Sequence, residues 1–383
     1  MTTKRKFNAA RFFDAFQSHE DELATLLTSH SVPVPAPLDT GAICRMVRDA
    51  THADDSLTCL LHQLNDLATT KGREIVMSTA TSFVIPGGHP GTDMTDQRAA
   101  LWLWNTNKDA FESAMDRLAA SGIQGSQIAL FPGRSAKSIE DDAAAVAGFE
   151  GQLNANIASW KGAERFTIHH YRDGAMLVIL VFCERTAEVS WEMDHGSSVV
   201  KTRIGRPVIQ DVLFYDESTG ELEIEASHAK HREVLRNSFA EGVMGDDSFF
   251  PMEEQTRVLN LQKLVELNFT LPVRTGHQVQ ITAVTLREFF SMKPFTVTLS
   301  ANRQDVIEIL RAKHAAGLIE RASIRSVRIE LILGSGRLDR KSIELSGDNR
   351  IKFNRASHAD EVYRYLRHWT LMGNRVVEEQ SAA

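Results

Sequence analysis

Apolar side chains recur at intervals of three and four residues along much of the first 160 positions, as they do in helices that bury one face. Phe12, Phe16, Leu23 and Leu27 belong to the first such series, and three prolines between positions 33 and 37 end it. We therefore predict a helical domain over residues 1–160. Its further elements are helices near 40–50, over 54–69, over 95–120 and after Ser138, and a short strand at 127–131.

From about residue 165, apolar and polar side chains alternate, which is the pattern of half-buried strands. Asp173-Gly174 separates two runs of strand-forming residues and is a strong hairpin signal. Residues 216–220 separate two further runs in the same way. These turns predict an antiparallel β-meander over residues 161–245, with a closing helix over 228–243.

Residues 246–375 combine the two patterns, and glycine-containing turns at 334–336 and 347–349 separate the last strands. The chain is therefore predicted to be α+β, with a helical N-terminal domain, a central antiparallel sheet and a C-terminal α/β module. Residues 376–383 are expected to form a flexible tail. The elements expected in the module are strands at 278–287, 294–300, 324–333, 340–346 and 349–354, and helices at 303–317 and 358–372.

The charge of the chain is unevenly distributed. The whole chain carries 43 lysines and arginines against 50 aspartates and glutamates, a net charge of −7. Residues 301–375 alone carry 15 basic against 9 acidic residues. A basic segment on an acidic chain indicates contact with a polyanion, or with the acidic part of the same molecule.

The last predicted helix shows how this charge would be presented. Its spacing places Val362, Leu366 and Trp369 inward, and it leaves basic side chains on one outer face at intervals of three and four. Cations of this kind bind phosphates without reading sequence. The residues predicted to bind nucleic acid are Arg337, Arg340, Lys341, Lys352, Arg355, Arg364, Arg367 and His368.

The leading hypothesis is a non-catalytic or accessory cytoplasmic protein that contacts nucleic acid or a protein partner through this basic face. A second copy of the chain is one such partner, and pairing of the face with the chain's own acidic half is the alternative. Helix, three strands and helix is also the order of elements in double-stranded-RNA-binding domains. The resemblance is in order alone, since residues 356–361 lack the lysine-rich start of that family's final helix.

A metal-dependent hydrolase or nuclease on the central sheet is the second hypothesis, since such enzymes hold divalent ions with carboxylates. Asp216, Glu221, Glu223 and His228 are its candidate residues. The three alternating glutamates of 221–225 equally suit a solvated strand face. A structural subunit of a larger assembly is the third class of function.

Several other classes are disfavoured by the sequence. The longest apolar run, residues 175–183, is about half the length of a membrane helix, so no membrane contact is expected. Three cysteines form no disulfide framework and suit a reducing cytoplasm. The segment before Lys137-Ser138 has Leu130 and Ala136 where a phosphate-binding loop requires glycines. The histidines and cysteines do not show the four-ligand spacing of a closed zinc site, so the leading hypothesis expects no metal ion and no cofactor.

Overall fold

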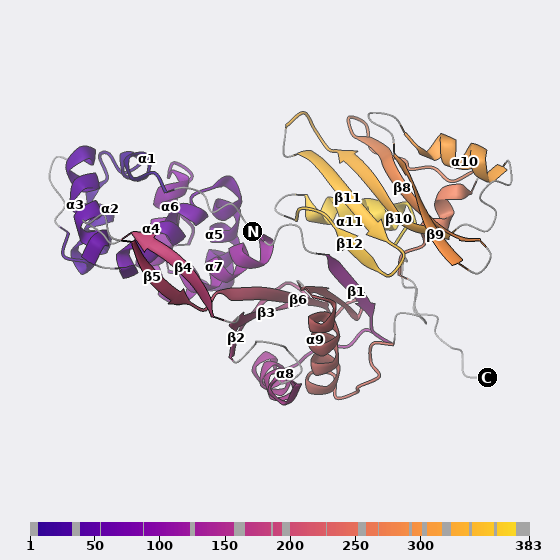
Figure 1. Ribbon diagram of the computed structural model, residues 1–383. Helices are drawn as coiled ribbons and strands as arrows, with labels where there is room; N and C mark the ends of the chain where they lie inside the picture. The colour runs from indigo at the N-terminus through magenta and orange to yellow at the C-terminus, as the bar shows by residue number, and fades with distance from the viewer. Residues whose placement is uncertain are drawn as a thin grey trace. The chain divides into compact units, whose positions relative to one another are not determined.

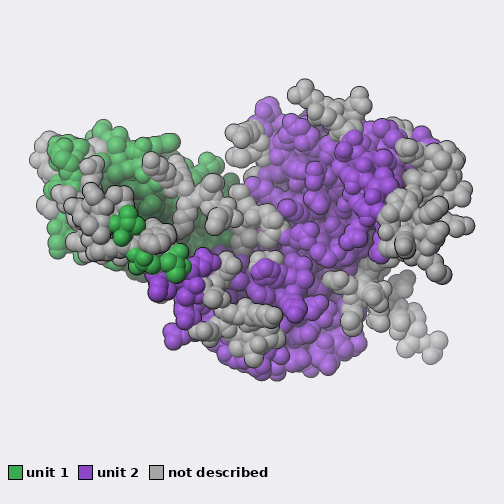
Figure 2. All heavy atoms as spheres, in the orientation of Figure 1, with its two compact units in different colours: residues 1–123, 189–203 green, residues 124–188, 204–383 purple. Residues whose placement is uncertain are grey.

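A computed structural model provides the structure of the protein. It divides into two compact units, residues 1–123 with 189–203 and residues 124–188 with 204–383 (Figure 2). The fold is α+β, as predicted from the sequence. The described residues are 7–32, 39–53, 55–86, 88–122, 127–156, 165–184, 187–193, 200–226, 228–251, 258–266, 268–290, 293–300, 305–315, 323–336, 339–355 and 358–372.

The first unit contains the predicted helices that end before residue 123, packed around a core of leucine, isoleucine and phenylalanine side chains. Phe12, Phe13 and Phe16 are fully buried in this core. The helices are α1 (Ala9–Asp14), α2 (Glu20–Ser29), α3 (Thr40–Ala53), α4 (Asp55–Leu67), α5 (Thr70–Ser82), α6 (Asp96–Thr106) and α7 (Lys108–Gly122).

Two predicted helices are each divided in the structure. Ser18 has a left-handed backbone with φ of 65°, so the first apolar series is split between α1 and α2. Asn107 separates α6 from α7, and its Oδ1 accepts the backbone N–H of Ala110 at 3.0 Å. Such an amide cap begins a new helix although the apolar spacing continues across it. Helix α5 was not among the predicted elements.

The second unit is built on one sheet of ten strands, in the order β2-β3-β6-β7-β1-β12-β11-β10-β8-β9 (Figure 1). Each neighbouring pair in this order is antiparallel. The strands are β1 (Ile128–Pro132), β2 (Phe166–Asp173), β3 (Met176–Glu184), β6 (Val208–Asp216), β7 (Glu221–Glu225), β8 (Gln278–Phe290), β9 (Lys293–Ser300), β10 (Ser323–Ile332), β11 (Arg340–Ser346) and β12 (Arg350–Lys352).

Strand β1 joins the two halves of this sheet. It pairs with β7 on one side and with β12 on the other, and all five of its residues are buried. Ile128 and Leu130 belong to the core beside the C-terminal strands, whereas Ala129 and Phe131 belong to the core beside the central strands. Successive side chains of a strand point to opposite faces. The two halves therefore bury opposite faces of one sheet.

In the central half, α8 (Asp142–Asn156) and α9 (Ala229–Gly242) lie side by side against the sheet (Figure 1). The two helices meet at glycines. A Cβ placed on Gly148 would lie 2.3 Å from the carbonyl oxygen of Gly242, which is far inside van der Waals contact. Only glycine permits this approach, so the pair fixes where the helices cross.

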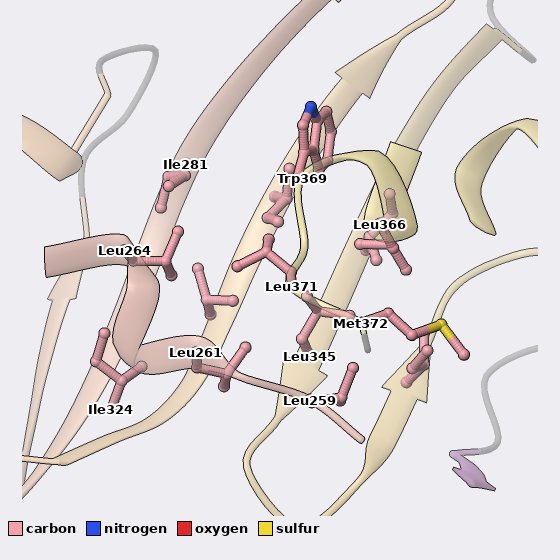
Figure 3. Packing of buried hydrophobic residues seen from close by; sticks show 14 of the residues in the cluster. Leu259, Leu261, Leu264, Ile281, Ile324, Leu345, Leu366, Trp369, Leu371 and Met372 are labelled. Atoms are coloured by element: carbon pink, nitrogen blue, oxygen red, sulfur yellow. The ribbon is translucent and has the colours of Figure 1, made fainter. Parts of the chain in front are cut away.

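In the C-terminal half, the core is covered by the 3₁₀ helix η2 (Leu261–Val265), α10 (Ile307–Ala315) and α11 (Ala359–His368). Figure 3 shows Leu366 and Trp369 of α11 and the following turn among side chains from the strands and from η2. Trp369 is 1% exposed and Leu366 is fully buried. The inward positions predicted for the last helix are confirmed.

Two further strands, β4 (Glu188–Met193) and β5 (Val200–Gly205), form a separate two-stranded sheet, and residues 189–203 group with the first unit. The predicted meander and C-terminal module share the ten-stranded sheet with β1, and the predicted boundaries at 160 and 245 stay predictions. None of the helices in the described ranges has the length and hydropathy that crossing a bilayer requires.

Candidate functional site

Two arginines and a histidine meet at the outer side of α11. Arg364 and His368 lie one turn apart on the helix, and Arg274 approaches from the segment before β8. All three side chains are exposed and line one open pocket of about 260 Å³. Pro272, Val273 and Tyr365 complete the lining of this cationic pocket. None of the residues that line it is acidic.

Aromatic side chains hold the walls of the cationic pocket. The Tyr365 hydroxyl accepts the backbone N–H of Arg274 at 3.1 Å and lies 2.7 Å from Nδ1 of His277. Nε1 of Trp369 donates to the carbonyl oxygen of Pro272 at 2.8 Å, and the Tyr365 and Trp369 rings are stacked. Residues 272–274 are thereby fixed to α11, so the backbone that carries Arg274 is already positioned.

Arg355 lies on the other side of α11 and is not part of this surface. Its guanidinium pairs with the carboxylate of Glu223 on β7 and donates to the Tyr363 hydroxyl. The Phe214 ring also lies 4.6 Å from the guanidinium carbon. The Arg355 side chain is 9% exposed. We call Arg355, Glu223, Tyr363 and Phe214 the buried arginine cluster.

The protonation of the buried arginine cluster follows from its surroundings. Burial lowers the pKa of Arg355, but the interactions with Tyr363, Glu223 and Glu225 outweigh it and raise the pKa above the ordinary arginine value. Burial also raises the pKa of Tyr363. The cluster is therefore an arginine–carboxylate ion pair with a neutral tyrosine, and the positive charge of Arg355 is balanced inside the protein.

The other predicted nucleic-acid-binding residues divide between paired, buried and exposed positions. Arg340 on β11 forms an ion pair with Glu330 at 2.5 Å, and Arg367 lies 3.6 Å from Glu221. Lys341 is 4% exposed, and burial lowers the pKa of its side chain. Lys352 on β12 is exposed. Arg337 lies outside the described residues.

The structure does not bring the candidate hydrolase residues together as a metal site. Glu223 is held by Arg355, and Glu221 lies beside Arg367. Asp216 accepts the backbone N–H and the hydroxyl of Ser218 in the turn after β6. Within the described ranges, no cluster of three or more histidine, cysteine, aspartate or glutamate side chains has the arrangement of a metal site.

One acid–base pair was missed at the sequence level. Asp211 on β6 is fully buried, and its Oδ2 lies 3.2 Å from Nδ1 of His231 on α9. The residues are twenty positions apart, so no local spacing indicated the pair. The neighbouring thiol of Cys183 is fully buried, and burial raises its pKa to about 12. The thiol therefore stays protonated and is not a nucleophile for this pair.

The segment that resembles a phosphate-binding loop has another role. Nζ of Lys137 donates to the backbone carbonyl of Met244 at 2.7 Å, and the backbone carbonyl of Lys137 accepts the Tyr215 hydroxyl. The lysine therefore fastens the loop before α8 to the end of α9. The cationic pocket is the stronger candidate for binding an anion.

A comparison with models of known protein families finds none that matches this chain. A comparison with curated proteins finds no significant match either. The functional conclusion is accordingly drawn from the chain's own geometry.

Proposed function

We propose that this chain is a non-catalytic or accessory binding protein that contacts the phosphate backbone of a nucleic acid through its cationic pocket. The observation that carries the proposal is the convergence of Arg274, Arg364 and His368 on one open pocket whose lining residues include no acid. Among the described residues, no acidic side chain forms an ion pair with Arg274 or Arg364.

The chemistry of these side chains suits phosphate. A guanidinium presents parallel N–H donors that match two oxygens of one phosphate, and such charge-assisted hydrogen bonds are stronger than neutral ones. The pocket, at about 260 Å³, is slightly smaller than the roughly 300–1,000 Å³ of pockets that enclose small molecules. It is therefore suited to bind one phosphate group of a longer chain that extends beyond the pocket.

The proposal uses fewer residues than the sequence suggested. Arg355 and Lys341 are buried, and Arg340 is paired with Glu330, so they are not assigned a phosphate contact. Arg367 is 41% exposed, lies beside Glu221 and does not line the pocket, so it is not assigned a phosphate contact either. Lys352, exposed on β12, is a further contact of the same type. A cytoplasmic location remains part of this proposal.

Fluorescence anisotropy with labelled duplex and single-stranded DNA and RNA, at low and at physiological salt, tests the proposal. The wild-type protein is expected to bind, and its affinity should fall steeply with salt because binding releases counterions. The Arg274→Gln/Arg364→Gln double variant should lose most of this affinity.

Arg340→Gln is the matched control, since Arg340 is an exposed arginine of the same unit that is paired with Glu330. The control should bind like the wild type. No binding at low salt, or equal binding by the double variant, would overturn the proposal. If nucleic-acid binding is absent, an acidic protein partner is the next candidate to test.

A further inference from the structure

A second pocket, larger and of different chemistry, lies at one end of the C-terminal strands. Its volume is about 900 Å³, and its lining comes from β8 to β12, from the turn at 347–348, from residues 259–262 and from Gln127. We call it the strand-end pocket. It shares no lining residue with the cationic pocket, and the proposed function does not use it.

The strand register explains the polar lining of the strand-end pocket. Thr285 on β8 lies opposite Ser326 on β10, Ser326 lies opposite Ser346 on β11, and Ser346 lies opposite Arg350 on β12. Residues directly opposite one another share a face of the sheet. Three hydroxyls and a guanidinium therefore form a row across four strands, and the hydroxyls span roughly 10 Å at a strand spacing of about 4.8 Å.

A second row supplies positive charge. Arg287 on β8 lies between Thr296 and Ser323 on the neighbouring strands. Beside it, the pairing of β10 with β8 shifts register between Ile324 and Ser326. The extra residue at this bulge is Arg325, whose side chain is exposed and lines the pocket. Bulges re-aim a side chain, and they are enriched beside binding sites.

The charges of the strand-end pocket are mixed, which separates it from a polyanion surface. Asp348 pairs with Arg350, and Glu344 lies 3.5 Å from Arg328. These two carboxylates would repel a phosphate backbone that runs across the pocket, but they accept hydrogen bonds from the hydroxyls of a ligand that presents one terminal phosphate. Within the described part of the chain, no acidic side chain forms an ion pair with Arg325.

We infer that the strand-end pocket binds a phosphorylated sugar. The phosphate lies against Arg325 and Arg287, and the sugar hydroxyls bind the row formed by Thr285, Ser326 and Ser346. The ligand is either a free nucleotide or the phosphorylated end of a nucleic-acid strand, since both present the same chemistry.

Isothermal titration calorimetry of the full chain with ribose 5-phosphate, AMP and inorganic phosphate tests this inference. A pentanucleotide with and without a 5′-phosphate forms the fourth arm. Ribose 5-phosphate is expected to bind at least about tenfold more tightly than inorganic phosphate, because only the sugar reaches the hydroxyl row. Binding of AMP assigns the free nucleotide, and binding of the phosphorylated pentanucleotide alone assigns a strand end.

Arg325→Gln should weaken binding by about tenfold or more, whereas the matched control Arg340→Gln should not change it. Ser346→Ala, a second variant at the end of β11, should narrow the difference in affinity between ribose 5-phosphate and inorganic phosphate. Arg364→Gln should leave the affinity for ribose 5-phosphate unchanged. A loss of binding at the strand-end pocket is therefore distinguishable from a loss of binding at the cationic pocket. Absence of binding by all phosphorylated probes, or wild-type binding by folded Arg325→Gln, would overturn the inference.

Discussion

Two arginines that lie close together in the sequence, Arg355 just before α11 and Arg364 on it, have opposite surroundings. Arg355, just before the helix, is 9% exposed and is paired with Glu223. Arg364, on the helix, is exposed beside Arg274 and His368. A count of charges treats the two arginines as equal. The comparison shows that the fold neutralises some of the basic stretch internally and presents the rest to solvent.

This difference in surroundings sets the energetic role of each arginine. A buried ion pair gains little net stability over apolar residues, but removing one partner leaves the other charge buried and unpaired. An exposed cation contributes little to folding and remains free to interact with an external anion. Substitution of Arg355 should therefore change the free energy of unfolding, and substitution of Arg364 should change the affinity for nucleic acid.

The largest expected effect is on the buried arginine cluster. Arg355→Met leaves the Glu223 carboxylate without its cation in a buried site, and it should lower the free energy of unfolding by roughly 3–5 kcal/mol. Urea denaturation followed by circular dichroism measures this change.

The double variant Arg355→Met/Glu223→Leu is the control for the same cluster. It removes both charges and should recover much of the lost stability. A loss below about 1 kcal/mol in Arg355→Met would show that the cluster is solvated, and the contrast with Arg364 would then disappear.

The next effect is on binding at the cationic pocket. Arg364→Gln should weaken binding to labelled duplex by about tenfold, which is about 1.4 kcal/mol, through loss of one charge-assisted phosphate contact. Its free energy of unfolding should stay within about 0.5 kcal/mol of wild type, because the side chain is exposed. Anisotropy measures the affinity and urea denaturation measures the stability of the same preparation. A destabilised Arg364→Gln variant would show that Arg364, like Arg355, contributes to folding.

An ion pair of intermediate burial should give an intermediate effect. The Arg172 guanidinium hydrogen-bonds Asp142 at the start of α8 and holds the pKa of that carboxyl below its ordinary value. The stabilisation is therefore present above the unfolded-state pKa of about 3.9 and is lost as the pH falls through the lower folded-state pKa. Asp142→Asn should cost about 1 kcal/mol at neutral pH.

The acid dependence provides the check on this prediction. Unfolding free energies of Asp142→Asn should fall less steeply than those of wild type below about pH 4. Parallel pH profiles of the two proteins would contradict the assigned role of Asp142.

The smallest effect is expected at the exposed pair of Arg340 with Glu330. The Arg340 side chain is 59% exposed, and such pairs contribute about 0–1 kcal/mol. Arg340→Gln should change neither unfolding nor duplex binding measurably, as urea denaturation and anisotropy can test. Loss of duplex binding in Arg340→Gln would show that the phosphate contacts extend from α11 to Arg340 on β11.

The sequence predicted the local part of this picture. The spacing of Val362, Leu366 and Trp369 placed these side chains inward and Arg364 and His368 outward, and the structure agrees. A helical period determines which residues share a face, so an outward position can be read without knowledge of the rest of the fold.

The pairing of the cations could not be predicted in this way. Arg355 and Glu223 are 132 positions apart, and only the order of strands in the sheet brings them together. Arg274 was missed because it precedes the basic stretch and is fastened to α11 by Tyr365 and Trp369. No sequence period encodes contacts of this kind.

The most direct test of the central claim is the slope of log affinity against log salt concentration for duplex DNA. The wild type, Arg364→Gln and Arg340→Gln should be measured together. The account predicts a slope whose magnitude is smaller by about 0.9 in Arg364→Gln and unchanged in Arg340→Gln, because of these two arginines only Arg364 neutralises a phosphate and so releases a counterion from the DNA. An unchanged slope in Arg364→Gln, or a slope whose magnitude falls equally in both variants, would contradict this account.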